Sequence, residues 1–141
     1  MTQDLIRERQ AMLAGMTPTL KAGSYHFCTT DAATVPASLL SRSLAIFRED
    51  KGTALILSSE DAQAHGFDLS MPMARIVLEV YSALDGVGLT AGVAGALADA
   101  GIPCNMVAAY HHDHVFVPEA MAQRAVEILL AVQRDATSLP D

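Results

Sequence analysis

The chain has 141 residues, of which 51% are hydrophobic and 18% charged, and its formal net charge is −7. This composition excludes a disordered chain, and the length fits one ordinary domain or two small modules that share a core. The excess of acidic residues, 16 against 9 basic ones, argues against nucleic acid and anionic membranes as partners. Cys28 and Cys104 lie far apart in sequence and show no CxxC or CxxH spacing, so neither a zinc motif nor a disulfide framework is indicated. No apolar stretch is long enough to cross a bilayer. We therefore expect a cytoplasmic protein of bacterial type that needs no cofactor.

The first half of the chain predicts short elements of both kinds. In chain order, these are a helix at 3–14, a strand at 23–30, an irregular stretch at 31–43, strands at 44–50 and 53–58, and a helix at 59–65. Gly15 and Pro18 end the first helix. Ser58, with Asp61 three residues later, is typical of the start of a helix.

The second half repeats much of this order. It predicts a strand at 74–82, a glycine-bearing loop, a helix at 89–100, strands at 102–110 and 114–117, and a helix that begins at Pro118. The last helix has an apolar stripe formed by Met121, Ala125, Leu129 and Val132. Both halves thus contain a strand, a polar turn, a second strand and a helix, in "LAIFREDKGTALILSSEDAQA" and in "MVAAYHHDHVFVPEAMAQRA".

Such a repeat indicates duplicated units, each too small to bury its own sheet face. The second copy reads β–α–β–β–α, and one further strand would complete a split βαβ unit of ferredoxin-like type. No candidate strand follows residue 134. We therefore predict that the two copies exchange edge strands and form one intertwined unit.

The histidine-rich stretch "AAYHHDHVFV", residues 108–117, sits at the turn of the second hairpin. We predict a turn made by His112 and Asp113, flanked by His111 and His114. A metal site needs three or four converging ligands, and this arrangement offers at most two imidazoles on one face, so we expect no metal there. The sequence leaves open whether the stretch only forms a turn or also contacts a ligand.

The loop at 85–90, "DGVGLT", is the stronger candidate for a binding site. It precedes a helix, whose free N–H groups and positive dipole end favour a carboxylate. Glycine lets the backbone approach a ligand closely, and Asp85 could hold an ammonium group. An α-amino acid supplies both charges. The alternative is a tight turn with a solvated aspartate.

Residues 84–129, "LDGVGLTAGVAGALADAGIPCNMVAAYHHDHVFVPEAMAQRAVEIL", resemble the ACT domains. The match is closer to bacterial stand-alone tandem ACT proteins, in which "VGLTA", "AGI", "YHHDH" and "FVP" recur and the first module has a hairpin like "FREDKG". Aspartate kinase regulatory domains are more distantly similar.

The resemblance implies an α+β fold: a tandem pair of ferredoxin-like βαββαβ modules with antiparallel sheets and exchanged edge strands. It implies an N-terminal module at 1–72, with an extra first helix and a degenerate second one, and a C-terminal module at 73–135. It also implies a non-catalytic regulator that senses a small molecule, usually an amino acid, and self-associates as a dimer. The expected ligand-binding residues are Asp85, Gly86, Val87, Gly88, Leu89, Thr90, Asn105, Met106, His112 and Asp113.

Two other functions remain open at this stage. The chain could be a protein–protein interaction module in which the loop at 85–90 is purely structural. It could also be a small enzyme, with or without a metal, that uses the residues at 111–114.

Overall fold

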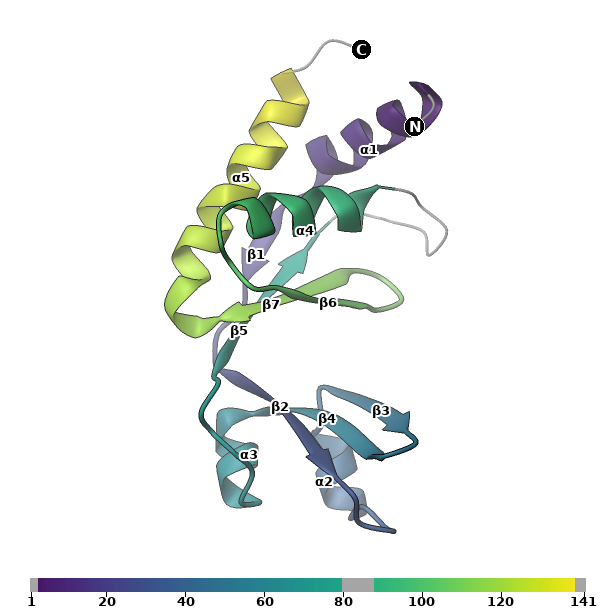
Figure 1. Cartoon of the computed structure of the whole chain (residues 1–141), viewed down its shortest axis with the longest axis vertical. Coiled ribbons are helices and arrows are strands. Elements are labelled where there is room, and N and C mark those ends of the chain that lie inside the picture. The colour runs from purple at the N-terminus through teal and green to yellow at the C-terminus, as the bar shows by residue number, and fades with distance from the viewer. Residues whose placement is uncertain (1–2, 80–87, 139–141) are drawn as a thin grey trace. The chain divides into compact units, whose positions relative to one another are not determined.

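The computed structural model describes residues 3–79 and 88–138 (Figure 1). The chain divides into two compact units: unit 1 is Met1–Ala22 with Ala74–Asp141, and unit 2 is Gly23–Met73. Unit 1 contains α1 (Gln3–Gly15), β1 (Pro18–Leu20), most of β5 (Met73–Leu78), α4 (Leu89–Asp99), β6 (Asn105–Ala108), β7 (Asp113–Pro118), the 3-10 turn η1 (Glu119–Met121) and α5 (Ala122–Ser138). Unit 2 contains β2 (Tyr25–Thr30), α2 (Ala37–Arg42), β3 (Ala45–Glu49), β4 (Gly52–Ser58) and α3 (Ser59–Ala64).

The strands of unit 1 lie in the order β1-β5-β7-β6. The three residues of β1 pair antiparallel with β5, from Pro18 opposite Leu78 to Leu20 opposite Ile76. This strand was not predicted, because three residues that begin with proline show no periodicity. It nevertheless supplies the edge that the second repeat lacks, so the predicted exchange of edge strands is confirmed. Met73, the first residue of β5, belongs to unit 2 and pairs with Tyr25 within that unit.

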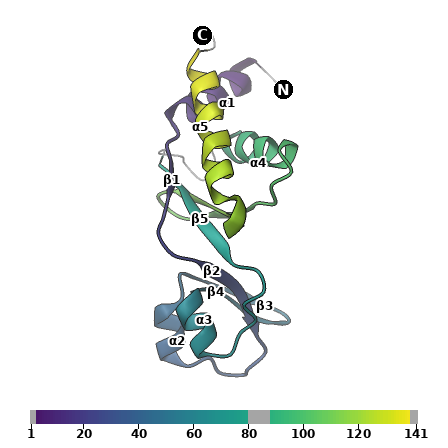
Figure 2. The same ribbon diagram turned by 90° about the vertical axis from the view of Figure 1, so that its left-hand side faces the viewer.

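One face of the unit 1 sheet is buried beneath α4 and α5 (Figure 2). The inward residues alternate along the strands, as the pleat requires. Ile76, Leu78, Val115 and Val117 are buried against Val93 and Leu97 of α4 and Leu129 of α5. None of the helices in the described part combines the length and apolar character needed to cross a lipid bilayer.

The small residues of α4 have a packing explanation at one position. A Cβ atom added to Gly92 would lie 2.9 Å from Leu13 Cδ1 of α1, so the missing side chain lets the two helices approach closely. Gly95 has no such neighbour. Close helix packing therefore accounts for one of the two helical glycines.

Unit 2 is a three-stranded antiparallel sheet in the order β3-β4-β2. Its core joins Cys28, Leu55 and Leu57 of the sheet to Leu39 of α2 and Ala62 of α3. The predicted cap of α3 is present: Ser58 Oγ accepts a hydrogen bond from the Asp61 N–H at 3.1 Å. The second helix of the chain, α2, is short, with 6 residues against 11 in α4.

Several predicted strands are longer than the observed ones. The predicted strand at 74–82 ends at Leu78, and residues 80–82 lie outside the described part. The predicted strand at 102–110 is reduced to Asn105–Ala108. Ile102 is buried all the same, because it packs in the core of unit 1 as the chain leaves α4.

Candidate functional site

The predicted binding loop is partly described. Asp85, Gly86 and Val87 lie outside the described residues, whereas Gly88, Leu89 and Thr90 form the start of α4. Gly88 is the N-cap residue with φ 106°, a left-handed conformation that favours glycine, and no side chain caps the helix. The first N–H groups of α4 therefore have no intrahelical acceptor, and Gly88 supplies no side chain to cap them.

An arginine from a distant part of the sequence lies against this helix start. A Cβ atom on Gly88 would be 2.7 Å from Arg9 Cβ and 3.1 Å from Arg9 Nε, so the Arg9 side chain covers the N-cap. Among the described residues, the buried Nε atom of Arg9 has no hydrogen-bond partner. A guanidinium at the positive end of a helix is electrostatically unfavourable unless an anion joins it. Sequence reasoning missed Arg9, because nothing in the spacing links α1 to the loop before α4.

The other predicted residues of β6 have separate roles. Asn105 begins the strand opposite Phe116 and is exposed, so its amide needs no buried partner. Met106 lies opposite Val115 and packs against the core of unit 1. Their predicted part in ligand binding stays a prediction.

The predicted register of the β6–β7 hairpin is wrong. Ala108 pairs with Asp113, and the Ala109 N–H donates to the His112 carbonyl at 3.1 Å, so the tip consists of Tyr110 and His111. The two rings at the tip make an edge-to-face contact with centroids 5.1 Å apart. The reason for the shift is burial: the observed register leaves Tyr110, 82% exposed, and the exposed His111 at the tip, and it half-buries the three residues that follow.

The shift brings His112, Asp113 and His114 from the tip to a half-buried position at the start of β7. The Nδ1 atoms of both histidines are buried without a hydrogen-bond partner in the described part of the chain. Burial lowers the pKa of His114, and the positive charges of Arg75, His112 and Lys21 lower it further, against the opposing effect of Asp113. Burial raises the pKa of Asp113, against the opposing effect of the two histidines.

These residues do not form a metal centre within the described ranges, 3–79 and 88–138. No group of three or more His, Cys, Asp or Glu side chains there could hold a metal ion.

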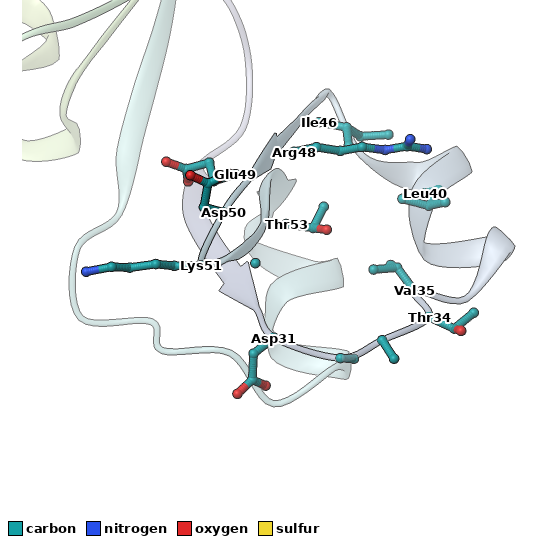
Figure 3. A pocket seen from close by; sticks show the side chains of 13 residues that line it. Asp31, Thr34, Val35, Leu40, Ile46, Arg48, Glu49, Asp50, Lys51 and Thr53 are labelled. Atoms are coloured by element: carbon teal, nitrogen blue, oxygen red, sulfur yellow. The ribbon is translucent and has the colours of Figure 1, made fainter.

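A cavity of about 690 Å³ lies in unit 2, where no binding residue was predicted. Its walls are the loop at 31–35, Leu40 of α2, the strand β3 from Ile46, the turn at 50–51, and the first residues of β4. Figure 3 shows Val35, Leu40 and Thr53 around the hollow, with Arg48 lying across it toward α2. The signal that could have located it is the repeat: the loop at 31–35 follows β2 as residues 85–90, predicted to be a binding loop, follow β5 along the chain.

Comparison with known proteins identifies both halves of the chain. Two ACT domain models match, one at residues 6–74 and one at residues 73–131. A search of curated protein sequences found no match.

Solved structures show the same fold. A Vibrio cholerae protein of unknown function, described as a possible transport protein, is 40% identical, with a TM-score of 0.80 over 91% of this chain and 98% of that one. A protein from Agrobacterium tumefaciens is 18% identical, with a TM-score of 0.68 over 84% and 89%. The ligand-free regulatory subunit of aspartate kinase from Thermus thermophilus is 12% identical, with a TM-score of 0.60 over 83% and 98%.

The family and the fold agree with the resemblance found in the sequence. The matched models follow one another along the chain, and each spans one copy of the internal repeat. The chain therefore belongs to the ACT domain family, whose members are regulatory ligand-binding modules.

Proposed function

We propose that this protein is a non-catalytic regulator that binds an α-amino acid at the start of α4. The observation that carries the proposal is the uncapped helix start at Gly88 with the Arg9 side chain packed against it. Two positive features, the helix dipole and the guanidinium, meet at one place and favour a carboxylate. Because Gly88 has no side chain, Arg9 can lie directly against the backbone of the helix start.

The ligand's carboxylate accepts from the free N–H groups of Leu89 and Thr90 and pairs with Arg9. The predicted partner of the ligand's ammonium group is Asp85, which lies outside the described residues. The family supports the regulatory role, and the ligand-free aspartate kinase regulatory subunit from Thermus thermophilus has the same fold. We expect the signal to pass to a partner through a self-associated, cytoplasmic form of the protein.

A thermal-shift screen against the common amino acids tests this function. At least one amino acid should raise the melting temperature at millimolar concentration, because a ligand that binds only the folded state stabilises it. Arg9→Gln should remove most of that shift, whereas Arg9→Lys, which keeps the charge, should retain part of it. Arg124→Gln is the matched control, since it removes the same charge from an exposed side chain in the first turn of α5.

The screen also separates the proposal from its two alternatives. No stabilisation by any amino acid at several millimolar would contradict amino-acid binding and favour a pure interaction module. An enzyme that uses the hairpin would lose a measurable turnover on His112→Ala, with ligand stabilisation unaffected.

A further inference from the structure

The cavity in unit 2 has the size of a small-molecule site. Its volume of about 690 Å³ lies within the range of roughly 300–1,000 Å³ that ligand pockets occupy. All of its walls come from unit 2: a loop, one helix and one hairpin. The cavity is therefore separate from the proposed amino-acid site at the start of α4.

The charged side chains of the cavity do not all face it. Figure 3 shows Asp31, Glu49, Asp50 and Lys51 pointing away from the hollow, whereas Arg48 lies across it. For Glu49 the reason is the pleat, since successive residues of β3 point to opposite faces of the sheet. The hollow itself therefore contains one cation and no carboxylate.

Arg48 is available to a ligand. In the described part of the chain, its guanidinium has no hydrogen-bond or ion-pair partner, in contrast to Arg42, which pairs with Asp61 at 3.3 Å. Thr53 lies directly opposite Arg48 in the β3–β4 register, so its hydroxyl is on the same face. A planar guanidinium with a neighbouring hydroxyl suits a carboxylate, which can accept from both.

The rest of the wall is aliphatic and branched. Val35 and Leu40 pack against the core of unit 2 with one side and line the hollow with the other. Ile46 is 45% exposed at the edge strand β3. An apolar ligand body would remove this surface from water, which is a favourable change roughly in proportion to the area covered.

The frame of the cavity is held by a close backbone contact. A Cβ atom on Gly52 would lie 2.5 Å from the Thr30 carbonyl oxygen, so the β3–β4 turn and the end of β2 approach as only glycine permits. This contact joins the hairpin to the loop that follows β2. The two walls of the cavity are thus fixed relative to each other without a ligand.

We propose that the cavity of unit 2 binds an aliphatic monocarboxylate with a branched chain. The carboxylate pairs with Arg48 and accepts from Thr53, and the branched body lies against Val35, Leu40 and Ile46. An α-ammonium group is not part of this ligand class, because the acidic side chains at the rim point away from the hollow. This ligand goes beyond the proposed amino-acid site in both place and chemistry.

Isothermal titration calorimetry with four probes tests the ligand class: 4-methylpentanoate, acetate, leucine and isoamylamine. We expect 4-methylpentanoate to bind at least about tenfold more tightly than acetate, because each buried methylene contributes to affinity, and isoamylamine not to bind. Absence of 4-methylpentanoate binding at millimolar concentration would overturn the proposal. So would binding of isoamylamine, or tighter binding of leucine than of 4-methylpentanoate at this cavity.

A pair of charge-removing variants locates the binding. Arg48→Gln should weaken 4-methylpentanoate by about tenfold or more, the usual effect of losing a hydrogen bond to a charged group. Lys51→Gln removes the same charge from a side chain that points away from the hollow, so it should leave the affinity unchanged. Equal losses in the two variants would overturn the assignment to Arg48.

The same experiment distinguishes this inference from the proposed function. Arg9→Gln, which should abolish amino-acid stabilisation, should leave 4-methylpentanoate binding intact. If Arg9→Gln abolishes 4-methylpentanoate binding and Arg48→Gln does not, the carboxylate binds at the start of α4, and the cavity of unit 2 is not its site. If leucine binding is lost in the Arg9→Gln variant and in no other, leucine binds at the start of α4. That result does not contradict the assignment of 4-methylpentanoate to the cavity.

Discussion

Two glycines of the same helical segment should respond in opposite directions to alanine. Gly88 caps α4 with φ 106°, and a Cβ atom there would lie 2.7 Å from Arg9 Cβ. Gly95 lies in the middle of the helix, is exposed, and would place its Cβ atom in open space. Gly88→Ala should therefore destabilise the protein, and Gly95→Ala should stabilise it.

The expected magnitudes follow from the backbone and the contact. A non-glycine residue in a left-handed conformation costs about 1–2 kcal/mol, and relief of the contact with Arg9 requires a further shift because carbon atoms prefer about 3.5–4.0 Å. Gly88→Ala should thus lower the free energy of unfolding by about 2–3 kcal/mol. Gly95→Ala should raise it by about 1 kcal/mol, the difference in helix propensity.

Urea denaturation followed by circular dichroism measures both changes, provided that the slope of the transition is the same in each variant. Equal effects of the two substitutions would refute the reasoning, because the positive φ and the contact with Arg9 would then carry no energy. Gly88→Ala should also reduce amino-acid stabilisation, since a new methyl group displaces the side chain that holds the carboxylate. Gly95→Ala should leave that stabilisation intact and is the control.

Two further predictions concern the cavity frame and pH. Gly52→Ala should destabilise unit 2 more than Gly23→Ala, because both residues have positive φ but only Gly52 would clash with the Thr30 carbonyl; urea midpoints of the two variants compare them, and equal loss would refute the clash. Burial lowers the pKa of His114 below its ordinary 6.5, so the unfolded chain takes up a proton first, and stability should fall as pH drops below that value. His114→Gln should flatten the fall in melting temperature between neutral and mildly acidic pH, and an unchanged profile would contradict this assignment.

The hairpin and the helix cap of the first repeat were predicted correctly. Both are determined by residues that are close together along the chain, and tertiary contacts do not change them. The turn after Glu49 and the cap at Ser58 are set by residues within three or four positions. The same holds for the family, because its motifs are contiguous in 84–129. The sequence was sufficient to predict the structure wherever a residue interacts with a partner that is near in sequence.

The features that the sequence did not predict depend on contacts between residues that lie far apart along the chain. β1 is defined by pairing with β5, about sixty residues away along the chain, and no local pattern marks three such residues. The position of the β6–β7 tip depends on which residues of the hairpin are buried. The sequence does not reveal that burial, so His112 and Asp113 were predicted as the turn. Arg9 reaches the start of α4 from a helix that neither repeat contains.

At equivalent places in the fold, the two copies of the repeat present different chemical groups. In unit 1 the first helix after β5 has 11 residues and begins after the N-cap residue Gly88, and the cation there is Arg9 of α1. In unit 2 the loop after β2 leads into a 6-residue helix, which leaves a cavity between that loop and the hairpin, and the cation is Arg48 of the hairpin itself. A helix that starts at a glycine has no side-chain cap from that residue for its first backbone N–H groups, whereas a short helix leaves more of the neighbouring sheet uncovered. Under the two proposals above, the length of this helix would determine whether a copy binds its carboxylate through the backbone or through side chains.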